Sequence, residues 1–374
     1  MTVSHLTNSL RNNEIRVDLK PKPTVRSERA KVTVVPKAAA ELGRTLTHEH
    51  LADCFTDFYV PPPSHLKRFL EGKIEIRTLG ILRQYPYSNI YNLKYDDADT
   101  AEAVFEDVKL FREFGGGTIV ENSNHGLNRD ISLMKTVSTE TGVNIIAGTG
   151  YYVAATQPKG TLGLTKEQMY DLMIKEMTVG CDEAPDVKTG FIGEVGSTWP
   201  IEDFEKRAII ATGEAQAQLK CAVSFHPGRN SAAPFEIMRI YQEAGGNARK
   251  AILSHLDRTL PDEQKLLEFA DEYQCYCQFD LCGTECSFYQ LEPSLDMPSD
   301  AQRIDRVKLL RDNGKLQRVL LSHDIHTKHR LMKFGGHGFA HIFNNVLPQM
   351  LVKGFTQKEV DTITIDNPRT WLSS

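Results

Sequence analysis

The sequence lacks the features that mark several specialised classes of protein. Its 374 residues carry no excess of positive charge, since 44 Lys and Arg are outnumbered by 49 Asp and Glu, which argues against a nucleic-acid-binding protein. The stretch 141–158 has no charged residue, but it is interrupted by Gly, Asn, Gln and Pro and does not fit a membrane-spanning helix. The N-terminal residues lack the apolar core of a secretory signal peptide. We therefore expect a globular protein that binds neither nucleic acid nor membranes.

Cysteine is also sparse. The chain has 7 cysteines, an odd number, and without an export signal this favours reduced thiols and a cytoplasmic location. Four of them crowd one segment, but their CxC and CxxxC spacings differ from the paired CxxC of a structural zinc site. The spacings argue against zinc on Cys275, Cys277, Cys282 and Cys286. Cys275 and Cys277 would share one face of a strand, and we interpret these two as small hydrophobes.

The first 35 residues differ in composition from the remainder. They are polar, interrupted by Pro and almost free of aromatic side chains, so they cannot bury enough apolar surface to offset the entropy lost on ordering. We interpret 1–35 as a flexible extension and 36–374 as a single domain. Three acidic residues argue against the alternative of an organellar transit peptide: Glu14, Asp18 and Glu28.

Beyond residue 40, short β-rich runs alternate with segments of helical periodicity. Helical periodicity is clearest at 101–115, 205–220 and 262–273. Eight strand-like runs alternating with helices predict an α/β fold, namely a (β/α)8 TIM barrel, with a doubly wound sheet as the alternative. The runs are 45–51, 117–122, 144–150, 190–196, 222–228, 251–257, 275–280 and 318–324.

The placement of ionisable side chains favours the barrel. In a TIM barrel the C-terminal ends of the strands meet at one mouth, where the active site lies, whereas an open sheet would spread them along an edge. The long first connection, 52–116, contains three consecutive prolines and several aromatic residues, which predicts an ordered lid. The ionisable residues at or beside the run ends are His48, His50, Glu121, Glu194, His226, His255, Asp257, Asp280 and Asp324.

The tetrapeptide Thr-His-Glu-His is the sharpest local signal. Residues two apart on a strand face the same side, so His48 and His50 would both point into the barrel while Glu49 points outward. Each imidazole brings a ring nitrogen that needs a partner, and a shared metal ion satisfies both.

Four later residues extend this pattern. Glu194 lies in Gly-Glu-Val-Gly, His226 and His255 each end a run, and Asp324 follows the last one. With the first two histidines they would suit two divalent ions that share a bridging ligand. The alternative is that all six are separate polar residues with their own hydrogen bonds. Zinc is the preferred metal, with manganese or cobalt as alternatives.

Six motifs in order between Arg44 and Leu372 resemble the phosphotriesterase-related branch of the amidohydrolase superfamily. They are GRTLTHEH, GFIGEVGS, FHPGR, SHLD, LSHDIHTK and IDNPRTWL. The resemblance implies a TIM barrel that carries two divalent metals. It further implies that the ligands of the buried ion are His48, His50 and Asp324, those of the more exposed ion His226 and His255, and the bridge Glu194.

The same resemblance bears on the reaction. In the phosphotriesterases proper the bridge is a carboxylated lysine, and GFIGEVG contains no lysine, which argues against phosphotriester hydrolysis as the native reaction. The animal members of the related branch imply an amidase, with N-acetyltaurine as the substrate and other N-acetyl amino acids as weaker candidates.

Two metal ions would lower the pKa of a bridging water and polarise the substrate carbonyl, so that hydroxide attacks at neutral pH. We expect Asp324 to take the proton and pass it to the leaving amine. Asp257, two residues after His255, is expected on the same strand face as an orienting or relay residue. An ion pair of Asp257 with Arg258 or another cation is the alternative.

An anionic substrate would need basic contacts near the mouth. The segment 323–341 is rich in His, Lys and Arg and follows the last strand, so we expect it to form a loop over the barrel. The candidate substrate contacts are Arg229, His326, Lys328, Arg330 and Lys333, with Tyr152 as an aromatic wall. A solvated cationic loop and a third metal on His326 and His329 are the alternatives. The sequence does not decide whether Glu121 and Asp280 line the mouth or bond across strands.

These observations predict a binuclear metal-dependent hydrolase that cleaves the amide of small anionic N-acyl compounds. A lactonase or phosphoric ester hydrolase using the same metals is the alternative within enzymes. A metal-binding scaffold without activity is the third interpretation, and the complete ligand set with Asp324 argues against it. A small anionic substrate is the expected partner, and the oligomeric state is left open, a homodimer included.

Overall fold

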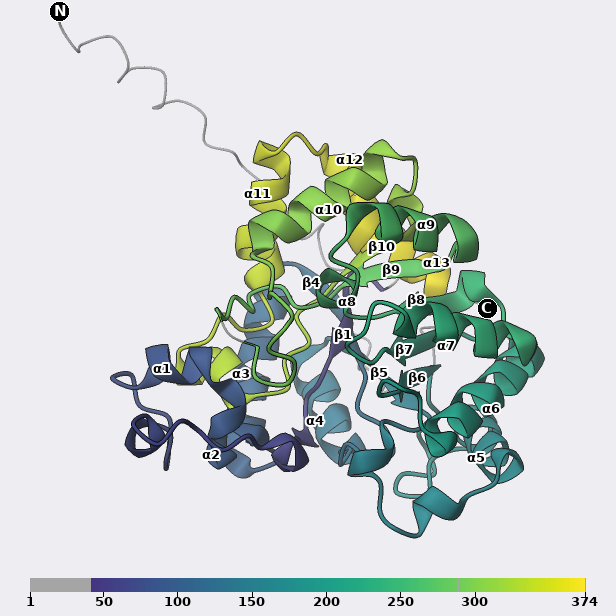
Figure 1. Cartoon of the computed structure of the whole chain (residues 1–374), viewed down its shortest axis with the longest axis horizontal. Coiled ribbons are helices and arrows are strands. Elements are labelled where there is room, and N and C mark those ends of the chain that lie inside the picture. The colour runs from purple at the N-terminus through teal and green to yellow at the C-terminus, as the bar shows by residue number, and fades with distance from the viewer. Residues whose placement is uncertain (1–41, 288, 374) are drawn as a thin grey trace, which may run out of the picture.

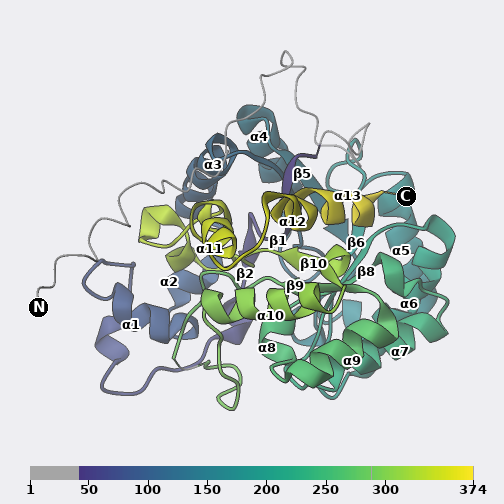
Figure 2. The same cartoon turned by 90° about the horizontal axis from the view of Figure 1, so that it is seen from above.

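The computed structural model describes residues 42–287 and 289–373, and the predicted extension 1–35 lies outside this part of the chain. Within it, eight parallel strands follow one another around a barrel in the order β1-β4-β5-β6-β7-β8-β9-β10 (Figures 1 and 2). The predicted TIM barrel is thereby confirmed, and the doubly wound sheet is excluded. The strands are β1 Arg44–Glu49, β4 Gly116–Glu121, β5 Asn144–Thr149, β6 Phe191–Gly196, β7 Val223–His226, β8 Ala251–Leu253, β9 Tyr276–Phe279 and β10 Val319–Leu321.

Helices surround the barrel, as Figure 2 shows from above. Several begin where a side chain satisfies a free backbone N–H, as when Asp97 accepts from Thr100 and Asp262 from Lys265. The helices expected at 101–115, 205–220 and 262–273 are present as α3, α6 and α9, with ends shifted by up to three residues. The longer helices are α3 Ala98–Glu113, α4 Ile131–Thr141, α5 Lys166–Thr178, α6 Asp203–Leu219, α7 Ala233–Glu243, α9 Glu263–Tyr273 and α10 Asp300–Asp312, and the short ones are α1 Leu79–Gln84, α2 Ile90–Leu93, α8 Leu256–Thr259, α11 Leu347–Val352, α12 Gln357–Asp361 and α13 Asn367–Leu372.

Apolar side chains fill the barrel below the mouth. One cluster gathers inward-facing residues from successive strands, such as Val120 of β4, Ile146 of β5 and Leu320 of β10, around Trp371 of α13. The Trp371 indole donates to the backbone carbonyls of Val223 and Lys250, at the starts of β7 and β8. The polar strand ends therefore occupy the opposite end of the barrel.

Buried apolar side chains also fill the space between barrel and helices. Cys275 and Cys277 lie in this layer as small hydrophobes, as expected, and Cys282 lies there too. None of the candidate metal clusters in the described part of the chain contains a cysteine. No helix among the described residues is long and apolar enough to cross a membrane.

Side chains join the first and last strands. The backbone N–H of Asp324 donates to the carbonyl of His48 at 3.1 Å, and the Ser322 hydroxyl oxygen lies 2.8 Å from the same carbonyl oxygen. The Glu49 carboxylate, fully buried, accepts from the Ser322 hydroxyl and from the backbone N–H groups of His323 and Ile325. The outward-pointing Glu49 thus fixes the β10 end, and with it Asp324, against β1.

The long first connection is ordered, as predicted. It carries α1 and α2, which lie to one side of the barrel in both views, and a short antiparallel pair, β2 Asp53–Cys54 with β3 Lys94–Tyr95. Phe55 and Tyr87 of this connection line the cavity at the barrel mouth.

Candidate metal centre

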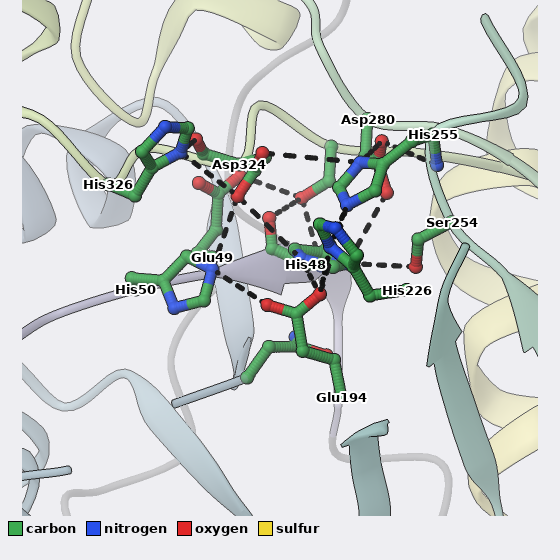
Figure 3. Close-up of polar contacts among 12 residues, drawn as sticks. His48, Glu49, His50, Glu194, His226, Ser254, His255, Asp280, Asp324 and His326 are labelled. Atoms are coloured by element: carbon green, nitrogen blue, oxygen red, sulfur yellow. Dashed lines mark hydrogen bonds and ion pairs between the residues drawn. The ribbon is translucent and has the colours of Figure 1, made fainter. Parts of the chain in front are cut away.

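Six side chains expected to bind metal meet at the C-terminal ends of the strands (Figure 3). His48 and His50 project from β1, Glu194 from β6 and His226 from the end of β7, while His255 and Asp324 follow β8 and β10. Glu194 occupies the middle of the group. Its Oε2 lies 3.4 Å from His48 Nε2 and 3.0 Å from His226 Nδ1, and its Oε1 lies 3.4 Å from His50 Nε2.

Of three groups of possible metal ligands among the described residues, two share Glu194, and the third combines His48, His255 and Asp280. One of the two sets that share Glu194 combines it with His48 and His50, the other with His226 and His255, and within each set the ligand atoms lie within 4.8 Å of one another. Asp324 Oδ1 lies 3.1 Å from His50 Nε2 and 3.7 Å from His48 Nε2, beside the first set. Two cation positions with one carboxylate between them fit this arrangement.

Two buried imidazole nitrogens face carboxylates without a well-aligned hydrogen bond. The Nε2 atoms of His48 and His50 lie 3.1–3.4 Å from oxygens of Glu194 or Asp324, but among the described residues neither forms a hydrogen bond, and both rings are fully buried. An unsatisfied buried polar atom is costly, and a lone pair directed at a metal ion would remove that cost. The residues present therefore fit a divalent metal centre.

The backbone is shaped to aim these side chains. The register between β6 and β7 shifts between Ile192 and Val195, at Gly193 and Glu194, as a bulge does when it redirects a side chain. A Cβ on Gly193 would lie 2.8 Å from that of Ser224, so only glycine fits there. His255 and Asp324 adopt the left-handed conformation, with φ of 57° and 54°, which is uncommon outside glycine and recurs at functional sites.

Charge compensation dominates the electrostatics. Burial acts to lower the pKa of His255, but the neighbouring Asp280 carboxylate outweighs it and raises that pKa to about 10. Burial and the adjacent His255 lower the pKa of His226 to about 3. Burial acts to raise the pKa of Glu194, but the surrounding imidazoles hold it well below its ordinary value. The carboxylates are therefore ionised and available to a cation.

A further layer of polar side chains orients the imidazoles. His255 Nδ1 lies 2.7 Å from Asp280 Oδ1, His48 Nδ1 lies 3.0 Å from the Ser254 hydroxyl, and His50 Nδ1 lies 3.0 Å from the Ser123 hydroxyl (Figure 3 shows the first two). Such partners fix the ring orientation and tautomer of metal-binding histidines. Asp280 was left undecided by the sequence. Ser254 is the first residue of the SHLD motif, whereas Ser123 belongs to none of the six motifs and follows the strand-end residue Glu121 by two positions.

Asp257 does not occupy the expected position. β8 ends at Leu253 and the chain turns at His255 into α8, so Asp257 lies in a helix rather than on a strand face. Its carboxylate accepts from Arg303 Nε at 2.8 Å and from the backbone of Leu281. The prediction of a shared strand face is therefore wrong, and Asp280 holds the orienting position beside His255.

A cavity of about 480 Å³ opens above the cluster and includes Glu194, His226 and Asp324 in its lining. Its walls carry many aromatic and basic side chains, together with the acidic residues Glu285 and Asp300. The Tyr152 hydroxyl lies 3.3 Å from His226 Nε2, and the Tyr87 hydroxyl 3.2 Å from His326 Nε2. The other aromatic and basic side chains of the lining include Phe55, Arg83, Arg229, Arg258, Tyr289 and Arg330.

The structure separates the predicted substrate contacts into two groups. Arg229, His326, Arg330 and Tyr152 line the cavity, although Arg330 donates to the backbone carbonyls of His323 and Asp324 and so braces the β10 end. Lys328 and Lys333 lie outside it, so their prediction as substrate contacts is wrong. Lys328 is bound by Asp97 and two backbone carbonyls, and Lys333 pairs with Glu102, both on the side of α3.

A third metal on His326 and His329 is not supported. The imidazole of His329 contacts Asn92 and that of His326 contacts Tyr87, so the two rings have different partners. Glu121, also left undecided, accepts from the backbone of Leu51 and Ser123 and thereby supports the Ser123–His50 contact.

Arg258 also lines the cavity, although the sequence did not predict it as a cavity residue.

A family model, related sequences and solved structures all match this chain over most of its length. The model of the phosphotriesterase family matches residues 30–372. Phosphotriesterase-related protein of Aedes aegypti is 52% identical over 337 residues, which cover 88% of this chain and 94% of that protein; the Drosophila persimilis protein is 51% identical over 333 residues, covering 89% and 95%. A resiniferatoxin-binding protein from Rhodobacter sphaeroides superposes with a TM-score of 0.86 at 29% identity, covering 93% of this chain and 96% of that chain. A phosphotriesterase homology protein from Escherichia coli, complexed with phosphate in its active site, has a TM-score of 0.71 at 26% identity and covers 89% and 99%.

Proposed function

Because this chain belongs to the phosphotriesterase family of metal-dependent hydrolases, we propose that it cleaves the amide bond of small anionic N-acyl compounds, N-acetyltaurine first among them. The observation that carries the proposal is a shared carboxylate, Glu194, between two sets of histidines beside a basic cavity. Two divalent ions, with zinc preferred, would bind there. When bound, they would activate a water molecule and polarise the scissile carbonyl.

Six side chains are proposed to hold the metals. His48, His50 and Asp324 would bind the buried ion, and His226 and His255 the more exposed one. Glu194 would bridge the two as an ordinary carboxylate, so no lysine modification is needed. The buried, unbonded Nε2 atoms of His48 and His50 support this assignment.

Asp324 is proposed as the proton carrier. Its carboxylate lies at the boundary between the buried cluster and the cavity, 3.3 Å from His326 Nδ1 and 3.1 Å from His50 Nε2. A carboxylate at this boundary can accept the proton of the attacking water and deliver it to the departing amine nitrogen. Asp257, engaged by Arg303, would act only by holding α8 in place.

The cavity walls are proposed to select the substrate. Tyr152 and Phe55 would enclose the acyl group beside the cluster, and Arg229 would meet the negatively charged tail. A charged group in a partly dry cavity needs a partner of opposite sign, which is why a basic wall supports an anionic substrate. The cytoplasmic location and the oligomeric state stay predictions.

A matched substrate panel tests this proposal. Metal-loaded enzyme should hydrolyse N-acetyltaurine, and kcat/KM should exceed that for a short lactone and for a phosphate triester by at least about tenfold. Release of acetate and amine, followed by NMR, identifies the bond that is cleaved. Faster turnover of the lactone or the ester would overturn the amidase assignment and favour the alternative.

A further inference from the structure

Four arginines of the described chain line the cavity without a carboxylate partner, and two of them stand apart. Arg83 and Arg330 donate to backbone carbonyls, whereas Arg229 and Arg258 donate side-chain hydrogen bonds only to hydroxyl groups. Arg258 is 3% exposed, and its guanidinium donates to the Thr259 hydroxyl at 3.2 Å. Arg229 is partly buried, and its Nε donates to the Tyr289 hydroxyl at 2.9 Å. Among residues 42–287 and 289–373, neither guanidinium forms an ion pair with a carboxylate.

Buried arginines elsewhere in the described chain have carboxylate or carbonyl partners. Arg303 pairs with Asp257 and Asp300, and Arg129 pairs with Glu176 and Glu183. Arg330 donates to two backbone carbonyls, although its Nε has no hydrogen-bond partner among the described residues. Burying a guanidinium without a carboxylate costs free energy, so Arg229 and Arg258, whose hydrogen bonds reach only hydroxyl groups, indicate an anion supplied by a ligand.

The two guanidiniums line the same cavity, and so does Tyr289, whose hydroxyl Arg229 contacts. Burial acts to raise the pKa of Tyr289, but Arg229 and Arg258 outweigh it and lower that pKa. Both arginines also act on Tyr152, whose hydroxyl contacts His226. They reach this place from different segments, since Arg229 follows β7 and Arg258 lies in α8, three residues after His255.

We propose that Arg229 and Arg258 form a two-guanidinium site for the anionic tail of the substrate, and that this site prefers a tail with three acceptor oxygens, such as a sulfonate, to a carboxylate. The two oxygens of a carboxylate lie in one plane and suit the fork of a single arginine. The oxygens of a tetrahedral anion point in three directions and can accept from two guanidiniums at once. The reaction considered in this inference rests on the proposed function, whereas the binding site for the tail does not.

Three compounds with the same two-carbon spacer separate charge from shape: N-acetyltaurine, N-acetyl-β-alanine and the neutral N-(2-methylsulfonylethyl)acetamide. We expect Arg258→Gln and Arg229→Gln each to raise KM for N-acetyltaurine by about 10- to 100-fold, with kcat much less affected because the tail is bound alike before and during reaction. KM for the neutral sulfone should stay within about twofold. The wild-type preference for sulfonate over carboxylate should shrink in both variants.

Two further variants keep the test decisive. Lys333→Gln removes a cation outside the cavity and should leave all three compounds unaffected. Arg258→Lys keeps the positive charge but loses the two parallel N–H donors of the guanidinium, so it should give an intermediate KM for N-acetyltaurine. It takes the place of Arg258→Gln if that variant does not fold. An equal rise in KM for the charged and neutral compounds, or an unchanged sulfonate preference, would overturn the proposal.

Direct binding separates this site from the proposed reaction. Propane-1-sulfonate and butyrate, titrated into metal-loaded protein and followed by NMR, report tail binding without hydrolysis. Stronger binding of the sulfonate, lost in Arg258→Gln, would support the two-guanidinium site even if no N-acyl compound were cleaved. Equal or absent binding of the sulfonate by the wild type would overturn the site, whatever amides the enzyme hydrolyses.

Discussion

His255 Nδ1 and Asp280 Oδ1 lie 2.7 Å apart at the ends of two neighbouring strands, β8 and β9. The same carboxylate oxygen accepts the backbone N–H of His255, so one aspartate fixes both the main chain and the ring of this residue. His255 Nε2 is thereby directed toward His226, 2.9 Å from its Nδ1, and toward Glu194. Asp280 therefore sets the geometry of the outer half of the candidate metal centre.

Asp280→Asn should weaken metal binding without unfolding the protein. The amide keeps the shape of the side chain but loses the charge that orients His255, and losses of this kind cost about 10- to 100-fold in metal affinity. Competition with a chromophoric chelator measures the effect. Asp186→Asn, which removes an exposed partner of Lys135, is the control and should leave the affinity unchanged. Unaltered affinity in Asp280→Asn would contradict the orienting role.

Glu49→Gln should lower both stability and metal affinity. The carboxylate accepts from the Ser322 hydroxyl and from the backbone and ring of His323 at 2.7–2.8 Å, in a fully buried place. Hydrogen bonds to a buried charge contribute about 1.5–3 kcal/mol, so we expect a loss in the free energy of unfolding of about 2–3 kcal/mol. Urea unfolding of the metal-free protein measures this loss. A variant as stable as the wild type, with normal metal content, would show that Glu49 does not hold β10 against β1.

Glu194 should act without chemical modification. Reconstitution of metal-free wild type with zinc should restore full activity equally with and without added bicarbonate, because a glutamate bridge needs no carbon dioxide. Glu194→Gln should bind the second ion far more weakly, since a neutral amide bridges two cations poorly. Recovery that depends on bicarbonate would point to a carboxylated lysine and contradict the bridge assignment.

The free energy of unfolding should depend on pH through Glu176. Burial acts to raise its pKa, but His125 and Arg129, at 3.0 and 2.8 Å, outweigh it and lower the pKa from 4.5 to about 2. A depressed pKa stabilises the ionised native state above pH 4.5, and this contribution is lost as the pH falls from 4.5 to 2. Urea unfolding should show a wild-type advantage over Glu176→Gln of about 3 kcal/mol at pH 7, which falls to roughly 1.4 kcal/mol at pH 3 and to less than about 0.5 kcal/mol at pH 2. A pH-independent difference would contradict the ion-pair assignment.

The convergence of the six side chains could be predicted from the sequence. The two-residue period of a strand places His48 and His50 on one face, and the regular alternation of strands and helices brings distant strand ends such as Glu194 and Asp324 to one mouth. These are properties of backbone geometry, which the residue pattern encodes directly.

Other features depend on tertiary contacts that the pattern does not encode. Asp257 was misplaced because the left-handed turn at His255 ends the strand and starts α8. Lys328 was misplaced because its partner Asp97 lies 231 residues away in the chain, at the start of α3. Arg258 was not predicted as a cavity residue because the direction of its side chain is set by the short helix α8.

The most direct test of a two-metal hydrolase is a titration of metal-free protein with zinc while bound metal and the rate of N-acetyltaurine hydrolysis are followed together. Activity should rise with metal content and reach its maximum at two ions per chain. His48→Ala and His226→Ala should each bind fewer ions and lose turnover. Full activity of the metal-free wild type, or a maximum at one ion with a fully active His226→Ala, would contradict the binuclear centre.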